Sequence, residues 1–171
     1  SNRLSKVWRL PGVTFRDYDY LYVADVKSLV GRHDPKAGPV DNAALILKTH
    51  LVGAMSKSGL RWRVSGTTLP RDPKIKVLRL ECTLEDIRQG SQDLRYWVGG
   101  GIGMPRMEWR TQFIDQATGQ VVCEVSKDTR GFGAEAFFSG GVLTDADLLE
   151  KGVRRYAKRL GKYVQDVSST P

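Results

Sequence analysis

The stretch Ile75-Lys-Val-Leu-Arg-Leu-Glu-Cys-Thr-Leu-Glu-Asp-Ile87 alternates apolar with charged or polar side chains. One side of the alternation holds Leu78, Leu80, Cys82 and Leu84, and the other holds Arg79, Glu81, Thr83 and Glu85. A period of two residues is typical of a strand with one buried face. The stretch therefore predicts a long strand packed against a core, and it decides the fold class.

Two further segments continue this pattern. Residues 106–115 place Met107, Trp109 and Phe113 on one face, and Val121, Cys123 and Val125 form the inner face of a returning strand. Between them, Asp115-Gln-Ala-Thr-Gly-Gln120 reads as a hairpin turn with its glycine at the strained position. The three segments together predict an antiparallel meander with its tight turn at one end.

The rest of the chain supplies helices and shorter strands. Residues 20–26 are rich in aromatic and β-branched side chains and predict a central strand, and residues 60–65 predict a short one. Asp41 can cap a helix that runs to about Lys57 and stops at Gly59, and Thr144 can cap a final helix. The expected order is β-α-β-β-β-β-α.

This order predicts an α+β fold of two layers. A single mixed, mostly antiparallel sheet of about five strands would be covered by two helices, which bury the apolar side of each element. We expect an N-terminal arm over residues 1–19, one α/β domain over 20–167 and a short tail over 168–171.

The composition of the chain limits the classes of function that it can have. The chain has 171 residues, 40% of them hydrophobic, and a net charge of +8. The apolar share is that of a packed globule, and no apolar run approaches the roughly 20 residues of a membrane-spanning helix. The positive charge favours contact with polyanions, but no block of five or six like charges appears, which favours a scattered, solubilising surface. Basic residues from Lys151 to Lys162 on the last helix are open to the same two interpretations.

The motifs of common catalytic and metal sites are missing from the sequence. Cys82 and Cys123 form no C-x-x-C pair, and His33 and His50 complete no zinc-ligand spacing. A bridge between the cysteines requires their strands to be neighbours. Residues 131–136 match the letters G-x-G-x-x-A, but they follow a strand late in the chain instead of opening a βαβ unit. We therefore expect no enzyme activity, no cofactor and no metal.

Two glycine-aromatic segments, 90–105 and 130–141, do not fit the plain scaffold. In the predicted meander both would lie at the end opposite the tight turn, a common place for binding. The candidate binding residues there are Arg95, Tyr96, Trp97, Arg106, Arg130, Phe132, Phe137 and Phe138. Two alternatives remain open: the aromatic side chains close the end of the core, or the segments form the deep pocket of an enzyme that acts on a small ligand.

The glycine run Val98-Gly-Gly-Gly-Ile-Gly103, the hairpin Asp115-Gln-Ala-Thr-Gly119 and the segment Arg130-Gly-Phe-Gly133 carry a family resemblance. This pattern resembles uncharacterised proteobacterial lipoprotein families of unknown function. In build, such domains are similar to the periplasmic domain of the curli secretion channel subunit and to the N-terminal domain of the Tol translocation protein. The family's lipobox cysteine is missing here, and we expect a precursor to carry the lipid anchor.

The resemblance implies a protein-interaction role at the bacterial envelope. We expect a location on the periplasmic side of a membrane, with anchoring to the outer membrane. The expected partner is an envelope protein or a second copy of the chain, and a lipid anchor would add contact with an anionic lipid surface. The alternative hypothesis is a basic nucleic-acid-binding domain, which rests on the net charge and on the basic face from Lys151 to Lys162.

Overall fold

The computed structural model describes residue 4 and residues 6–29, 38–88, 106–130 and 145–169. The strands are β1 (Lys6–Arg9), β2 (Tyr20–Val23), β3 (Lys27–Ser28), β4 (Arg63–Ser65), β5 (Val77–Arg88), β6 (Arg106–Asp115) and β7 (Val121–Arg130). The helices are η1 (Phe15–Asp17), a 3-10 turn, α1 (Gly38–Ser56) and α4 (Asp145–Ser169).

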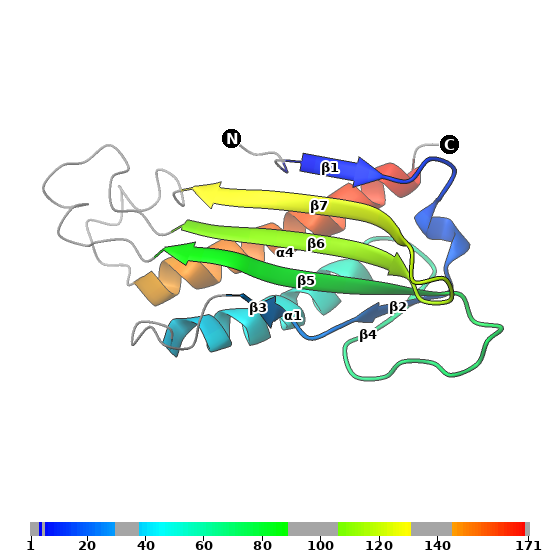
Figure 1. The fold of residues 1–171 in the computed structure, drawn as a ribbon, viewed down its shortest axis with the longest axis horizontal. Coiled ribbons are helices and arrows are strands. Elements are labelled where there is room, and N and C mark those ends of the chain that lie inside the picture. Colours follow the sequence, from blue (N-terminus) through cyan, green and yellow to red (C-terminus); the bar gives the residue numbers. More distant parts are fainter. Residues whose placement is uncertain (1–3, 5, 30–37, 89–105, 131–144, 170–171) are drawn as a thin grey trace, which may run out of the picture.

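Over these ranges the strands form one seven-stranded sheet. Its order is β1-β7-β6-β5-β2-β4, and β3 pairs with β5 beyond the end of β2. Strands β5, β6 and β7 form the expected antiparallel meander, whereas β2 runs parallel to both β5 and β4. Both α1 and α4 lie against one face of the sheet (Figure 1). The α+β class, with a single mixed sheet and helices on it, is confirmed.

The core fills the space between this face and the helices. The predicted inner positions of β5, from Leu78 to Leu84, are all fully buried, while Arg79 and Glu81 lie on the other face. Helix α1 contributes Leu47, Leu51 and Met55, and α4 contributes Val153, Tyr156 and Leu160, each 0% exposed. The apolar side chains that recur every two residues in the strand and about every 3.6 residues in the helices therefore form one core.

Residues 6–19 contribute to both the sheet and the core. Strand β1 pairs with β7 as an edge strand, from Lys6 opposite Ser126 to Arg9 opposite Cys123. Phe15 is 2% exposed, and its ring centroid lies 5.0 Å from that of Phe113. All four residues of β1 are exposed. The strand therefore has no buried face whose apolar alternation could predict it from the sequence.

Several element bounds differ from the sequence prediction. Helix α1 begins at Gly38 instead of after Asp41, and the strand expected over 20–26 ends at Val23 as β2, with the separate short strand β3 following at Lys27–Ser28. Propensity places helix ends less accurately than helix interiors. The predicted stop at Gly59 is confirmed by its φ of 77°, a left-handed conformation that glycine adopts without strain.

The predicted hairpin after β6 is also confirmed. Gly119 has a φ of 72°, and the Asp115 carboxylate accepts hydrogen bonds from the backbone N–H groups of Ala117 and Thr118 and from the Tyr18 hydroxyl. Partial burial raises the pKa of Asp115, but these hydrogen bonds outweigh it and hold the pKa below its ordinary value. The hydrogen bond from Tyr18 to Asp115 thus connects the N-terminal part of the chain to the meander.

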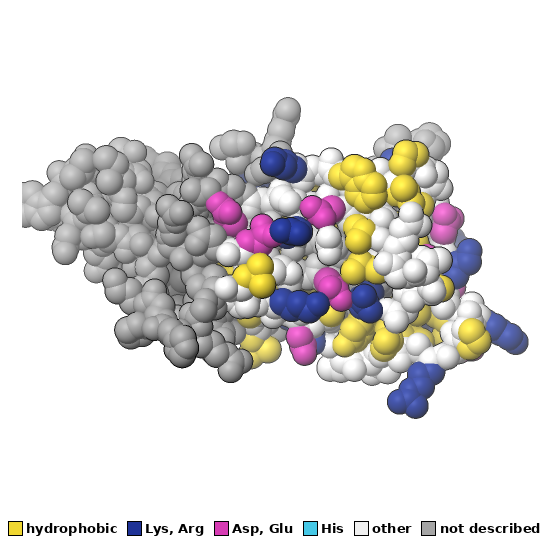
Figure 2. Space-filling view, in the orientation of Figure 1, with side chains coloured by type: hydrophobic (Ala, Val, Ile, Leu, Met, Phe, Trp, Pro, Cys, Tyr) yellow, Lys and Arg dark blue, Asp and Glu magenta, His cyan; other side chains and the backbone are white. Residues whose placement is uncertain are grey.

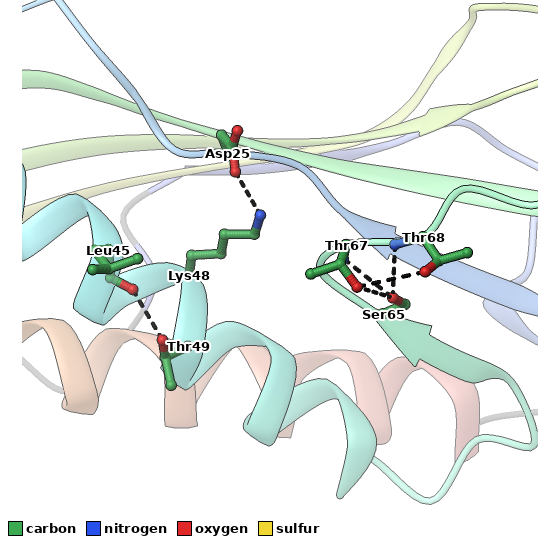
Figure 3. Close-up of polar contacts among 7 residues, drawn as sticks. All are labelled: Asp25, Leu45, Lys48, Thr49, Ser65, Thr67 and Thr68. Atoms are coloured by element: carbon green, nitrogen blue, oxygen red, sulfur yellow. Dashed lines mark hydrogen bonds and ion pairs between the residues drawn. The ribbon is translucent and has the colours of Figure 1, made fainter.

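A charged contact joins helix α1 to the link between β2 and β3. Lys48 donates to Asp25 in the link between β2 and β3, at 2.5 Å (Figure 3). Beside it, the Ser65 hydroxyl accepts from the backbone N–H groups of Thr67 and Thr68 and shapes the turn after β4. A Cβ atom on Gly66 of this turn would lie 3.0 Å from Lys48 Cε, so the turn packs directly on the lysine stem.

Candidate functional site

The end of the meander opposite the Asp115 turn gathers the strand ends that flank both glycine-aromatic segments. Strand β5 ends at Arg88, β6 begins at Arg106 and β7 ends at Arg130. In the sheet register, Arg88 is the partner of Arg106, and Arg106 is the partner of Arg130. Segments 89–105 and 131–144 therefore join the sheet at the same end, which we call the arginine end.

Most of the predicted binding residues lie outside the described residues. These are Arg95, Tyr96, Trp97, Phe132, Phe137 and Phe138. Arg106 and Arg130 belong to described strands and are brought together as backbone neighbours. Their roles in binding stay predictions.

The face of the sheet that α1 and α4 leave uncovered carries paired charges. Glu81 contacts Arg79 at 3.1 Å and Lys27 at 3.2 Å, Arg110 pairs with Glu85, and Gln112 donates to Glu124 at 2.7 Å. Acidic and basic side chains lie interspersed across the middle of this face (Figure 2). Exposed pairs of this kind add little to stability. Because acidic and basic side chains alternate among them, they do not give this part of the face a charge of a single sign.

A different arrangement lies on the inner face, between β7 and α4. Lys127 is 5% exposed, and its register partner on β6 is Trp109, which is 1% exposed. Directly opposite residues in an antiparallel pair lie on the same face with neighbouring side chains. Neither Lys127 Nζ nor Trp109 Nε1 has a hydrogen-bond partner in the described part of the chain, although both atoms are buried.

Two arginines of α4 complete this group. Burial, with a further contribution from the positive charges of Arg159 and Arg155, lowers the pKa of Lys127 to about 8. The Trp109 ring stacks on Tyr156, with centroids 6.1 Å apart, which places the indole beside this stretch of α4. We call Lys127, Trp109, Arg155 and Arg159 the cationic cluster.

The sequence did carry a signal for Lys127. The alternation that places Cys123 and Val125 on the inner face also places Lys127 there. A lysine at an inward position is unusual, because an ammonium group is costly to bury without a partner. The arginines gave no such signal, since a basic stretch in the second half of a helix is ordinary.

The basic stretch of α4 is split by the fold. Lys151, Arg154, Lys158 and Lys162 are exposed, whereas Arg155 and Arg159 are partly buried near Lys127. Arg154 also contacts Glu150 at 3.4 Å. The nucleic-acid hypothesis therefore loses part of the charged face on which it was based, and it stays an untested alternative.

The cysteines lie on strands that are not neighbours. Cys82 of β5 is paired with Thr111 of β6, and Cys123 of β7 is paired with Phe113 of β6. Because β6 lies between them, the two buried thiols are free, and the bridge that the sequence left open does not form.

Cys82 takes part instead in a buried polar chain. Thr111 donates to Cys82 Sγ at 3.3 Å, and the oxygens of Thr111 and Tyr156 are 2.6 Å apart. A threonine hydroxyl has one proton, so the Tyr156 hydroxyl is the donor to Thr111. Burial raises the pKa of Cys82 to about 12, which makes this thiol a poor nucleophile.

The described residues contain no group of three or more His, Cys, Asp or Glu side chains arranged to hold a metal ion. Among the same residues, neither long helix is apolar enough over its length to cross a bilayer.

The fold and the arginine end define a class of protein: a two-layer α+β domain in which residues 89–105 and 131–144 both join the sheet at one end. No protein-family model matches the chain, and no curated protein matches it at a significant level.

Solved structures do share the fold. PelC from Paraburkholderia phytofirmans, crystallised as a dodecamer, has 13% sequence identity and a TM-score of 0.54, with 91% of this chain and 98% of that chain covered. A point variant of that dodecamer gives 14% identity, a TM-score of 0.53 and coverage of 91% and 95%. Protein XCC0632 from Xanthomonas campestris, described by the family model DUF330, gives 13% identity, a TM-score of 0.56 and coverage of 95% and 91%. At these identities the similarity shows the fold alone.

These neighbours come from proteobacteria, the group to which the sequence resemblance pointed. The resemblance to an uncharacterised family of that group is supported at the level of fold. The similarity in build to the curli and Tol domains stays a prediction.

Proposed function

We propose that this chain is a non-catalytic domain of the bacterial cell envelope that binds a protein partner through its arginine end. The observation that carries the proposal is the register of Arg88, Arg106 and Arg130, since it joins both glycine-aromatic segments to the sheet at one end. Tyrosine, tryptophan and arginine are the residue types that dominate interface energies, and all three occur in these segments.

The first partner that we propose is a second copy of the chain. PelC, which shares this fold over 91% of the chain, was crystallised as a dodecamer. Most soluble oligomers are built from identical subunits with closed symmetry. Self-association through the arginine end would use the rigid meander as a base and the two segments as the contact.

The location is part of the same proposal. We place the domain on the periplasmic side of a membrane, anchored to the outer membrane through a lipid on its precursor. The support is the sequence resemblance to proteobacterial lipoprotein families, together with the fold shared with proteobacterial proteins.

The test is to measure mass in solution by light scattering after size exclusion, for the wild type and for the double variant Trp97→Ala, Phe137→Ala. We expect an oligomer for the wild type and a monomer for the variant, with an unchanged melting temperature. The matched control removes large apolar side chains elsewhere. Trp8, 50% exposed on the edge strand, and Leu69, 38% exposed after β4, are both changed to alanine.

Each outcome decides one point. A control variant that also becomes monomeric would move the interface away from the arginine end. A wild type that is monomeric at all concentrations would exclude self-association. The partner would then be another envelope protein, to be sought by cross-linking in envelope fractions with the same two variants. Equal cross-linking by all three proteins would refute the proposed surface.

A further inference from the structure

Strand β1 has a pairing partner on one side only. It is the last strand in the sheet order, and among the described residues it pairs with β7 alone. Figure 1 shows β1 at the outer margin of the sheet, beyond β7. The unpaired N–H and C=O groups of such an edge are a template on which another strand can form.

The register of β1 identifies the backbone groups that point outward. The Leu10 N–H donates to the Val122 carbonyl at 2.8 Å. In an antiparallel pair, residues that bond to the partner strand alternate with residues that do not. Leu10 and Trp8 therefore bond toward β7. The backbone N–H and C=O groups of Val7 and Arg9 point to the open side, where another strand could pair with them.

The side chains along this edge are apolar in the middle and positive at both ends. Val7 is 44% exposed and Trp8 is 50% exposed, and successive residues of a strand point to opposite faces of the sheet. Lys6 and Arg9 flank them, and both are exposed. In the described part of the chain neither of these two cations forms an ion pair.

Helix α4 lies beside the inner side of the same edge. The Tyr163 hydroxyl is 3.8 Å from the sulfur of Cys123, which is the register partner of Arg9. Tyr163 is partly exposed, as is Val167 one turn further along α4. A strand added to β1 would turn every second side chain toward this side of the sheet. Peptides that bind by strand addition obtain affinity from the backbone and specificity from such alternate side chains.

We propose that β1 is a docking site for an extended acidic segment of a partner protein, which adds to the sheet as an antiparallel strand. Charge decides between this partner and a second copy of β1. If two copies paired with all four residues matched, Lys6 of one would lie opposite Arg9 of the other, and like charges in that position are destabilising. Acidic residues opposite Lys6 and Arg9 form favourable pairs instead.

This docking site is separate from the arginine end. The arginine end consists of the strand ends of β5, β6 and β7, whereas β1 pairs with residues 123–126 in the interior of β7. The mass of the oligomer tests the arginine end, and peptide binding tests β1, so the failure of one proposal leaves the other standing.

The test is a titration of the ¹⁵N-labelled full chain with the synthetic peptide acetyl-Ser-Glu-Phe-Val-Glu-Ser-amide. Antiparallel to β1, its glutamates lie opposite Lys6 and Arg9. We expect saturable shifts of the β1 amide signals in ¹H–¹⁵N spectra. The amides of Val7 and Arg9 should exchange with solvent more slowly in the complex, while the Trp8 amide, already bonded to β7, should change little.

Two altered peptides separate strand pairing from charge. N-methylation of the peptide's valine removes the N–H that would donate to the Val7 carbonyl, and we expect at least tenfold weaker binding. Replacing both glutamates by lysine should weaken binding by at least the same factor. Equal binding of the methylated peptide would overturn strand addition, and equal binding of the lysine peptide would overturn the acidic character of the partner.

Variants of the chain test the same edge. Val7→Pro removes an outward N–H and no bond to β7, a position where an edge strand tolerates proline, and binding should weaken at least tenfold. The double variant Lys6→Glu, Arg9→Glu should lose the acidic peptide and bind the lysine peptide, which keeps the test decisive if Val7→Pro does not fold.

The matched control is Arg63→Glu, which changes an exposed arginine on β4, the strand at the other end of the sheet order. We expect it to bind the acidic peptide as the wild type does. Absence of a saturable shift in the β1 amides, or equal binding by the wild type and the variants of β1, would overturn the proposal.

Discussion

Gly161 of α4 lies so close to Ala54 of α1 that a Cβ atom on the glycine would be 3.0 Å from the Ala54 backbone oxygen and 3.2 Å from its Cβ. The two helices meet at these small residues, which lets both pack on the same face of the sheet (Figure 1). The obstacle at this point is largely backbone, which cannot turn aside as a flexible side chain can.

The first prediction concerns this contact. Gly161→Leu should lower the free energy of unfolding by about 1–3 kcal/mol, since overpacking forces the helices apart. The control is Gly53→Leu on α1, where an added Cβ meets nothing within 4 Å. It should stabilise the protein by about 0.5–1 kcal/mol, because leucine favours a helix more than glycine does. Chemical denaturation measures both, and a neutral Gly161→Leu would show that the helices can separate freely.

A second prediction addresses the buried chain from Tyr156 through Thr111 to Cys82. Tyr156→Phe and Thr111→Val should each cost about 1–3 kcal/mol, because each leaves a buried polar group unsatisfied. The double variant should cost less than the sum, since it removes both ends of the hydrogen bond. A double-mutant cycle in urea measures this coupling, and strictly additive losses would show that the bond contributes nothing.

The third prediction is alkaline destabilisation through the thiols. Burial raises the pKa of Cys82 from 9.0 to about 12 and that of Cys123 to about 11. A raised folded-state pKa means that the unfolded thiol ionises first. The stability that a neutral thiol provides is therefore complete below pH 9 and lost as the pH rises toward 12.

Unfolding free energies between pH 8 and pH 12 test this point in the wild type and in Cys82→Ala, whose pH slope should be smaller. At pH 8 neither thiol should react with a disulfide reagent until the chain unfolds. Rapid reaction of the native protein would show that at least one cysteine is more accessible than its burial indicates.

The fourth prediction has the opposite pH dependence. Burial and the two arginines lower the pKa of Lys127 from 10.5 to about 8, so the folded state binds this proton less tightly than the unfolded state. Its stability contribution is therefore present above pH 10.5 and lost as the pH falls through 8. Lys127→Met should be more stable than the wild type at pH 7 by on the order of 2 kcal/mol.

This advantage of Lys127→Met should disappear above pH 10.5, where lysine is neutral in both states. The exposed control Lys158→Met should change stability by less than about 0.5 kcal/mol at any pH. A constant advantage of Lys127→Met over the whole pH range would attribute it to packing and not to charge.

The meander was predictable because its evidence is local. Each turn and each alternation in residues 75–125 is visible over a few neighbouring positions, and the structure confirms the hairpin at Asp115 and the buried side of β5. Strands β1 and β3 left no such signal. They are short, exposed edge pieces, and only their pairing partners β7 and β5 make them strands.

One part of the candidate site was likewise predictable from the sequence, and another part was not. The common end of the glycine-aromatic segments followed from the topology of the meander, and the strand ends at Arg106 and Arg130 confirm it. The cationic cluster did not follow, because Arg155 and Arg159 come from a helix whose rotation against β7 the sequence does not specify. The inward position of Lys127 alone was visible.

The sequence by itself determined the class of this protein, since periods of two and of 3.6 residues dictate which side of each element must leave water. The tertiary structure alone decided which strands are neighbours and which helix faces which strand. Those choices depend on contacts between residues far apart in the chain, and such contacts leave no periodic trace. For that reason Cys82 and Cys123 are separated by β6, while the buried Lys127 of β7 lies near two partly buried arginines of α4.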